Sequence, residues 1–327
     1  MNKKEKIKEL QTIISREVTP LITSDYVLWG LPYYPNIGDT LIWEGEIEFL
    51  KEVPYKCLDT CGWDGYRVKP LGEDVTILIT GGGYFGDVWR KAWDNVMNTI
   101  EHYPNNRIVI LPNTIFYNDA DVMRSDVKRL SKLKKLVICV RDNVSYDTAK
   151  NNFKNEVRLV PDMAFCIKES YLMQWKKNET NSILYLKRND KELVDENIKI
   201  CGDSDNVDVR DWPTMDGKPL LTERIFSKIS SYSCSSNLQM ILGQSMLRKI
   251  EEFYAYHFYR KCLTCQGVEF VSHYRKVYTT RLHVMILSVL LGKTVRYIDN
   301  SYGKLSSFYN TWLTDCDDVL SYKNSIV

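Results

Sequence analysis

The sequence predicts an α/β protein built from two successive parallel β-sheets. Short apolar runs alternate with segments of helical period, and this order produces parallel strands joined by right-handed crossovers, with helices on both faces. A polar, aperiodic segment interrupts the alternation between residues 166 and 181, after which the alternation restarts. The length of 327 residues also corresponds to about two domains.

The first domain is predicted to cover residues 1–168. It opens with a helix at 3–17, whose residues Ile7, Leu10, Ile13 and Ile14 fall on one face. Apolar runs then predict strands at 26–30, 75–80, 107–111, 136–140 and 157–160. The helices predicted between these strands lie at 40–51, 92–102, 121–133 and 144–153.

The second domain is predicted at residues 181–327, after a linker at 169–180. Its strands are expected at 183–187, 207–209, 276–279 and 295–298, and its helices at 219–232, 238–260 and 282–291. Ligands of open parallel sheets bind beyond the carboxyl ends of the strands. Two such sheets therefore predict a cleft between them, with functional residues where strands end.

The composition excludes several classes of protein. The 44 lysine and arginine residues nearly balance the 42 acidic residues, which argues against a polycation that binds nucleic acid. The nine cysteines are scattered and odd in number, which is typical of reduced cytoplasmic thiols, and the isolated Cys262-x-x-Cys265 pair favours buried thiols over zinc. We expect a cytoplasmic protein, because the chain shows neither a signal peptide nor a transmembrane run; contact with the inner face of the membrane remains open.

Polar residues follow the first strand, between Gly30 and Thr40. Asp39 or Thr40 can cap the helix that begins there. Alternatively, Asn36 and Asp39 bind sugar hydroxyls, with Asp39 as a candidate general base. The sequence leaves both interpretations open. Among the many aromatic residues most are expected in the core, and Tyr33, Tyr34 and Tyr84 are the candidates beside a sugar.

The glycines Gly81, Gly82 and Gly83 follow the second strand, and with Gly86 they match the spacing of a dinucleotide-binding fingerprint. That fingerprint belongs to the first turn between strand and helix, which residues 36–39 already occupy. The glycines therefore indicate only that the backbone closely approaches a ligand or a neighbouring loop.

Three further polar residues lie at or near strand ends. Asn113 follows the strand at 107–111 and is expected to direct its amide to the cleft, and Asp162 lies near the junction of the domains. Arg141 can hold a phosphate or a carboxylate through two hydrogen bonds. An ion pair, with Asp142 or across the domains, is the alternative for Arg141.

The best anion site is predicted around Arg281, Leu282 and His283, where a strand ends and an apolar helix begins. The helix N-terminus offers free amide donors, Arg281 a guanidinium and His283 a titratable proton. Lys304, after the next strand, can reach the same place. The other three histidines lack a paired ligand spacing, so no metal is expected.

In combination, these motifs resemble the polysaccharide pyruvyl transferase family over about residues 26–312. The resemblance rests on Asn36-Ile-Gly-Asp39, Gly81-Gly-Gly83, Leu111-Pro112-Asn113, Arg141-Asp142-x-x-Ser145, Pro161-Asp162-Met-Ala-Phe165, Thr280-Arg281-Leu282-His283 and Gly303-Lys304. It implies two Rossmann-like domains of the glycosyltransferase B type, facing a central cleft. It also implies transfer of pyruvate from phosphoenolpyruvate to a hexose, commonly of galactose type, as a ketal in capsule, exopolysaccharide or cell-wall glycans.

The resemblance places the acceptor in the first domain and phosphoenolpyruvate in the second. The donor-binding residues of the family fall on Arg141, Arg281, Leu282, His283 and Lys304. On the acceptor side we expect Asn36, Gly82, Tyr84, Asn113 and Asp162. Asn113 stands where the family commonly has a glutamine, and Met163 where it commonly has a proline. Neither position binds the donor, so these differences bear on the choice of acceptor more than on the reaction. Phosphoenolpyruvate is a co-substrate, and no cofactor is expected.

In the predicted mechanism, His283 protonates the methylene carbon of phosphoenolpyruvate, so that one sugar hydroxyl attacks C2. A second hydroxyl then displaces phosphate and closes the ketal, with Asp39, or in reserve Asp162, as the base. The sequence does not identify the acceptor sugar or its carrier, for which a lipid-linked oligosaccharide is one candidate. It does not give the oligomeric state either.

Other functions fit the same scaffold, because function depends on the site more than on the fold. A glycosyltransferase that uses a nucleotide sugar needs an acidic residue for the ribose, and the sequence shows none clearly placed near His283. A non-catalytic glycan-binding protein needs no concentrated anion site. A nicotinamide enzyme is disfavoured by the misplaced glycine fingerprint.

Overall fold

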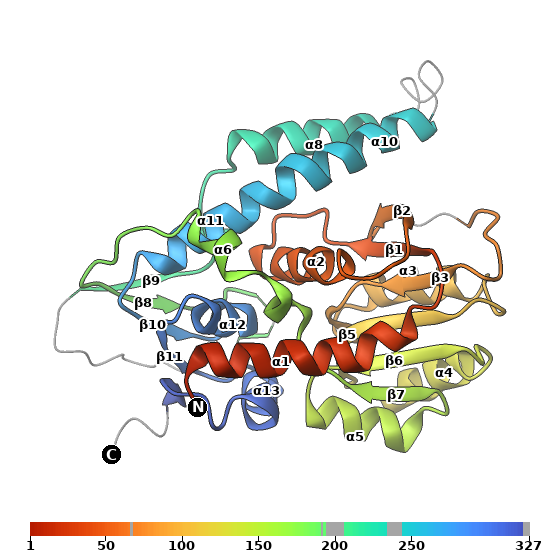
Figure 1. The fold of residues 1–327 in the computed structure, drawn as a ribbon, viewed down its shortest axis with the longest axis horizontal. Coiled ribbons are helices and arrows are strands. Elements are labelled where there is room, and N and C mark those ends of the chain that lie inside the picture. Colours follow the sequence, from red (N-terminus) through yellow and green to blue (C-terminus); the bar gives the residue numbers. More distant parts are fainter. Residues whose placement is uncertain (66–67, 191, 194–205, 234–243, 323–327) are drawn as a thin grey trace.

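Two parallel β-sheets, each with helices packed on it, form the molecule (Figure 1). The computed structural model describes residues 1–65, 68–190, 192–193, 206–233 and 244–322. The α/β class predicted from the sequence is confirmed, and every pair of neighbouring strands is parallel. Within the described part of the chain, no helix has the length and apolar character needed to cross a bilayer.

The first sheet has the strand order β2-β1-β3-β5-β6-β7. Strand β4 also pairs with β5, at residues 113–116, past the part of β5 that pairs with β3. Its strands are β1 (Tyr26–Leu31), β2 (Cys57–Gly62), β3 (Thr76–Ile79), β4 (Gly82–Gly86), β5 (Ile108–Phe116), β6 (Leu136–Val140) and β7 (Glu156–Leu159). Its helices are α2 (Ile37–Leu50), α3 (Arg90–Ile100), α4 (Ala120–Leu130) and α5 (Asn143–Asn152). Short crossovers of this kind are favoured because each helix covers the apolar strands that flank it.

The second sheet has the order β12-β11-β10-β8-β9. Its strands are β8 (Ile183–Leu186), β9 (Val207–Arg210), β10 (Lys276–Thr279), β11 (Thr294–Tyr297) and β12 (Val319–Ser321). Its helices are α7 (Pro213–Asp216), α8 (Leu221–Ser233), α10 (Gln244–Tyr254), α11 (Arg260–Ser272), α12 (Leu282–Leu290) and α13 (Lys304–Trp312), with a π-helical turn at Ala255–Tyr259 between α10 and α11.

The segment between the sheets is partly helical. This segment contains the 3-10 turn Met163–Cys166 and then α6 (Glu169–Met173), which lies within the predicted linker at 169–180. Another 3-10 turn, Thr19–Leu21, precedes β1. The helix predicted at 238–260 falls partly on residues 238–243, which lie outside the described residues. Its remaining part continues through the π-helical turn into α11, as far as Ser272.

One apolar cluster extends through both halves of the molecule. Alternate residues of β1 enter different clusters: Leu28 belongs to this shared cluster, whereas Val27 and Trp29 pack on the opposite face of the first sheet. The shared cluster also contains Leu184 from β8 and the apolar side chains of α12. The two sheets are therefore joined by a common core rather than by a polar seam.

Helix α1 (Lys3–Val18) lies across both halves, as Figure 1 shows. The predicted apolar face is confirmed, since Leu10 and Ile14 are fully buried. Its polar side reaches the end of the second sheet: Lys6 pairs with Asp315 at 2.7 Å, and Lys3 with Asp318 at 3.0 Å. Because α1 also contacts the turn Met163–Cys166 and α12, it fixes the two halves relative to each other.

Candidate active site

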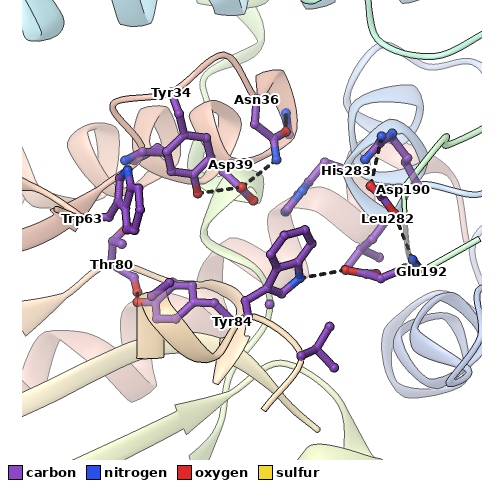
Figure 2. A pocket seen from close by; sticks show the side chains of 18 of the residues that line it. Tyr34, Asn36, Asp39, Trp63, Thr80, Tyr84, Asp190, Glu192, Leu282 and His283 are labelled. Carbon is purple, nitrogen blue, oxygen red and sulfur yellow. Dashed lines mark hydrogen bonds and ion pairs between the residues drawn. The ribbon is translucent and has the colours of Figure 1, made fainter. Parts of the chain in front are cut away.

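A cavity of about 620 Å³ opens between the carboxyl ends of the two sheets. Figure 2 shows Asn36 and Asp39 on one side, Asp190 and Glu192 on the other, and His283 between them. The lining includes Tyr34, Asn36, Asp39, Trp63, Gly83, Tyr84, Trp89, Arg188, Asp190, Glu192, Trp212, Arg281, Leu282, His283 and Lys304. The strand-end rule therefore located the pocket correctly.

The start of α2 forms one wall of this pocket. Asn36 caps the helix, because its Oδ1 accepts from the Gly38 amide at 2.9 Å, so the predicted cap at Asp39 or Thr40 is wrong. Asp39 is thereby free of a capping role. Its Oδ2 accepts from Asn36 Nδ2 at 2.7 Å and from Tyr34 Oη at 2.9 Å. This carboxylate is held by two donors at the edge of the cavity, in a position open to a ligand.

Aromatic rings continue the same wall. Tyr34 and Trp63 meet edge to face, with their ring centroids 6.1 Å apart. Tyr84 lies below them, and its hydroxyl donates to the carbonyl of Thr80 at 2.5 Å. Tyr33, the third predicted tyrosine, instead packs against Trp43 at 5.5 Å. Apolar ring faces beside a carboxylate and an amide suit a pyranose, which has both apolar faces and hydroxyl edges.

The start of the glycine segment is hydrogen-bonded to the buried carboxylate of Glu46. Glu46 accepts from the Gly81 amide at 2.7 Å and from Thr80 Oγ1 at 2.8 Å. Burial raises the pKa of Glu46 to about 8. A Cβ added to Gly81 would lie 2.6 Å from the carbonyl oxygen of Pro112, and one added to Gly82 would lie 2.9 Å from the Tyr84 ring. The predicted close approach of the backbone is therefore confirmed, but its neighbour at Gly81 is strand β5 and not a loop.

Arg141, at the end of β6, is completely buried beneath the pocket. Its Nη1 donates to Asp162 Oδ2 at 2.6 Å, and its Nε donates to Thr114 Oγ1 at 2.9 Å. His283 Nε2, from α12, lies 3.4 Å from both Asp162 Oδ2 and Arg141 Nη1. The structure thus brings together three predicted site residues from the two sheets.

Burial raises the pKa of Asp162, but the positive Arg141 and the hydrogen bond with His283 outweigh burial, so this pKa lies below its usual value. A buried carboxylate with a low pKa is a poor proton acceptor, which favours Asp39 as the base. Asn113 is also fully buried, and its Oδ1 faces the Phe85 amide at 3.4 Å. The acceptor roles of Asp162 and Asn113 stay predictions, since neither residue is in the lining of the cavity.

Asp142, the sequence-adjacent alternative partner of Arg141, is engaged elsewhere. Its Oδ1 accepts from the Ser145 amide at 2.8 Å and so caps α5, and it also accepts from the Ser307 hydroxyl at 2.9 Å. Arg141 instead forms its ion pair with Asp162, which follows β7 of the same sheet and is neither of the predicted partners.

Two cationic nitrogens from opposite sheets converge beside Gly83. A Cβ added to Gly83 would overlap Lys304 Nζ and would lie 3.2 Å from Arg141 Nη2. Arg141 Nη2 is buried and has no hydrogen-bond partner. Among the described residues, no hydrogen bond or ion pair engages Lys304 Nζ either. We call Arg141 and Lys304 the open cation pair; their nitrogens lie next to Gly83, which carries no side chain.

Burial lowers the pKa of Lys304 to about 8, and the positive Arg141 and Arg188 act in the same direction. Glu192 opposes this shift. An anion beside this ammonium group stabilises its charged form, because the anion restores the stabilisation that burial removed. The site therefore favours the binding of a small anion.

A second group of charges, which we call the arginine cluster, borders the pocket from the second sheet. It consists of Arg188, Arg281, Asp190, Glu192 and Asp211. Arg281 Nη2 donates to Asp211 Oδ2 at 2.6 Å and lies 3.3 Å from Asp190 Oδ2, and Arg188 Nη1 donates to Glu192 Oε2 at 2.6 Å. These cations are neutralised inside the protein.

Glu192 also connects the two sheets. Its Oε1 accepts from Trp89 Nε1 at 3.0 Å, and Trp89 precedes α3 of the first sheet. Its Oε2 accepts from Tyr302 Oη at 2.8 Å and from Asn300 Nδ2 at 3.0 Å. Burial raises the pKa of Glu192, but Lys304 and Arg188 outweigh burial, so this pKa lies below its usual value.

Sequence reasoning missed the acidic residues of the second sheet and the tryptophans Trp63, Trp89 and Trp212. Asp190, Glu192 and Asp211 follow the predicted strands at 183–187 and 207–209, and this position was the available signal. The absence of a well-placed acid, used against a glycosyltransferase, no longer holds as an argument. Within the described residues no group of three or more His, Cys, Asp or Glu side chains could hold a metal ion.

Comparisons with known proteins agree with the geometry. The family profile described as polysaccharide pyruvyl transferase matches residues 36–302. "Putative pyruvyl transferase EpsO" of Bacillus subtilis is 27% identical over 312 residues, which cover 95% of this chain and 90% of that protein. "Pyruvyl transferase 1" of Schizosaccharomyces pombe is 25% identical over 308 residues, covering 88% and 70%.

A solved structure shares the fold. The crystal structure of the functionally uncharacterised protein KP1_0663 from Klebsiella pneumoniae matches with a TM-score of 0.58 and 19% identity, over 92% of this chain and 93% of that one. At this identity the match supports the Rossmann-like α/β fold alone.

Proposed function

We infer the reaction from one premise: the chain belongs to the polysaccharide pyruvyl transferase family and is therefore a transferase. We propose that it moves pyruvate from phosphoenolpyruvate to a hexose, of galactose type, in a bacterial surface polysaccharide or its precursor. The observation that carries this proposal is the open cation pair. Arg141 Nη2 and Lys304 Nζ offer unsatisfied positive donors to a phosphate and a carboxylate.

The proposed arrangement is that of a glycosyltransferase B protein, with a first domain at 1–168, a linker at 169–180 and a second domain at 181–327. The acceptor lies along the wall formed by Asn36, Asp39 and the aromatic rings, and the donor lies near the open cation pair. The lining of the pocket by residues from both sheets supports this division. A cytoplasmic location completes the proposal, because phosphoenolpyruvate is a metabolite of the cytoplasm.

In the proposed reaction His283 gives a proton to C3 of phosphoenolpyruvate, which turns the methylene into a methyl group and leaves a cationic centre at C2. One sugar hydroxyl forms a bond to C2 and loses its proton to Asp39. The second hydroxyl attacks C2, the bond from C2 to the phosphate oxygen breaks, and inorganic phosphate leaves. The two sugar hydroxyls lose two protons in total. One of these balances the proton gained by the methyl group, and the other leaves on inorganic phosphate.

The electrostatics support each step. In this scheme the carboxyl groups of Asp162 and Asp39 stabilise a cationic centre at C2, while Arg141 and Lys304 stabilise the departing phosphate. His283 is kept in place by Asp162 and by the start of α2, where a Cβ on Gly38 would lie 2.8 Å from His283 Nδ1. No cofactor is required in this scheme.

Phosphate release from phosphoenolpyruvate, with galactose-containing lipid-linked oligosaccharide as acceptor, tests the reaction. His283→Ala is expected to lower kcat by about 10²- to 10⁴-fold, the usual share of a general acid. The control is His102→Ala, since His102 is exposed in the turn after α3 and is not in the pocket lining. Turnover of His283→Ala near that of the control would refute the acid role. Loss of donor binding alone would make His283 a phosphate ligand.

A glycosyltransferase is the second candidate, and Asp190 and Glu192 in the pocket are the observation that favours it. Calorimetry with phosphoenolpyruvate and with a panel of nucleotide sugars separates the two candidates. We expect binding of phosphoenolpyruvate alone, because both acids are already paired with Arg188. Binding of neither ligand type would leave the glycan-binding alternative.

A further inference from the structure

Helices α8 and α10 form a hairpin above the first sheet, seen at the top of Figure 1, that exposes large apolar side chains. The exposed fractions are 73% for Leu221, 38% for Ile225 and 52% for Tyr232 on α8, and 54% for Met246, 42% for Ile250 and 59% for Phe253 on α10. Spacings of four and seven on α8, and of four and three on α10, place each set on one stripe of its helix. Such contiguous exposed stripes mark interaction surfaces.

The exposed charges of the hairpin have a single sign. Over residues 218–233 and 245–261 the exposed charged residues are Lys218, Arg224, Lys228, Lys249 and Lys261. The acidic residues of the same segments, Glu223, Glu251 and Glu252, are buried or half-buried. Arg224 and Lys228 alternate with the apolar residues on the stripe of α8, and Lys249 does so on that of α10. Apolar and positive side chains are therefore mixed on the same outward faces.

We propose that the outward stripes of α8 and α10 dock the protein onto an anionic lipid bilayer. Helices that combine an apolar stripe with basic residues lie in the membrane interface, and anionic headgroups attract those bases. A second copy of the chain fits the surface less well. A two-fold dimer brings the same patch face to face, so it would set these lysine and arginine residues against one another without an acid between them.

The surface lies close to the pocket along the chain. Met215 of α7 belongs to the pocket lining and is separated from Leu221, the first residue of α8, by five residues. A protein docked through this hairpin holds the rim of its pocket near the bilayer. The inference does not depend on the proposed reaction, because its test measures binding to lipid.

Vesicle flotation tests the proposal, with vesicles of phosphatidylcholine alone or mixed with phosphatidylglycerol. We expect binding to the mixed vesicles that weakens as salt is raised, because the Debye length shortens. The variant Lys228→Glu/Lys249→Glu is expected to bind at least about tenfold more weakly, at roughly 1 kcal/mol for each basic residue. Ile250→Ser/Phe253→Ser is expected to lose binding as well. Because all four side chains are exposed, the variants retain the fold.

The matched controls are Val144→Ser and Lys150→Glu on α5, far from the hairpin, and they are expected to bind like the unaltered protein; Val144 is 58% exposed. Equal flotation with both vesicle types, or hairpin variants that bind like the controls, would overturn the proposal. Light scattering supplies another outcome. A dimer that Ile250→Ser/Phe253→Ser converts into a monomer would show that the surface binds a second copy.

Discussion

The open cation pair and the arginine cluster lie at the same pocket, whose lining contains Lys304, Arg188 and Arg281, yet their charges are balanced in different ways. In the arginine cluster, Arg281 is paired with Asp211 and Asp190, and Arg188 with Asp190 and Glu192. In the open cation pair, Arg141 keeps one buried nitrogen without an acceptor, and Lys304 approaches it beside Gly83. The difference teaches that an anion site is marked by a cationic group that keeps a donor without an acceptor, and that an arginine beside a cavity is insufficient evidence.

The largest effect is expected from Arg141→Lys. A lysine keeps the charge but cannot contact Asp162, Thr114 and a ligand at once, since it lacks the guanidinium fork. We expect kcat/KM for phosphoenolpyruvate to fall by about 10²- to 10³-fold, as for loss of one preorganised donor. Phosphate release at fixed acceptor concentration measures this change.

The matched control is Arg281→Lys in the arginine cluster. Its kcat/KM for phosphoenolpyruvate is expected to stay within about tenfold of the unaltered value, because its hydrogen bonds are made to the protein's own carboxylates. Thermal unfolding is expected at lower temperature for both variants, since each weakens a buried ion pair. Equal kinetic losses in the two variants would refute the comparison.

Lys304→Met is expected to change donor binding and stability in opposite senses. The dissociation constant of phosphoenolpyruvate rises by about 10- to 100-fold, the value of a charged hydrogen bond of about 1.5–3 kcal/mol. The free energy of unfolding stays the same or rises, because burial disfavours the ammonium that the substitution removes. Calorimetry and urea unfolding measure the two quantities. Lost stability with unchanged binding would make Lys304 a structural partner of Glu192.

The binding of phosphoenolpyruvate is expected to weaken as the pH rises through about 8, the lowered pKa of Lys304. Above that pH the free protein loses the ammonium charge, so affinity falls toward that of Lys304→Met. The sign for stability is opposite: between about 8 and the ordinary lysine pKa the unfolded chain binds more protons, so this group makes stability rise with pH. The inflection in affinity is expected to disappear in Lys304→Met; its persistence there would assign it to another group.

Gly83→Ala is expected to give the smallest effect. The added methyl group displaces the flexible end of Lys304, and donor affinity falls by about three- to tenfold, or roughly 1 kcal/mol. The double variant Gly83→Ala/Lys304→Met is expected to bind no worse than Lys304→Met, because both changes act on the same contact. Additive losses would show that Gly83 acts through something other than Lys304.

The sequence predicted most of the fold because apolar runs and helical periods reflect burial directly. It failed at β4, whose residues 82–86 include three glycines, and at β2, whose first residues are exposed. Neither segment has the apolar content that identifies a strand, so their pairing depends on the strands beside them. The three-residue β12 is too short for any period.

The candidate site was predictable to a similar extent, and for a different reason. Strand ends meet at one edge of a parallel sheet, and His283 and Lys304 accordingly line one pocket, with Arg141 buried next to them. The pairing of Arg281 could not be predicted, because Asp190 and Asp211 come from loops whose path depends on the tertiary structure. Charge at a strand end is visible in a sequence, whereas its neutralisation is not.

Helix α1 has a consequence for the order of folding during synthesis. Its Lys3 pairs with Asp318, 315 residues further along the chain, and its apolar face packs against α12. Contacts with such a large separation form slowly, and these cannot form before the second sheet has left the ribosome. The apolar face of α1 therefore stays partly exposed during most of translation. The yield of folded protein will depend on how well that face is shielded until α12 and Asp318 have been synthesised.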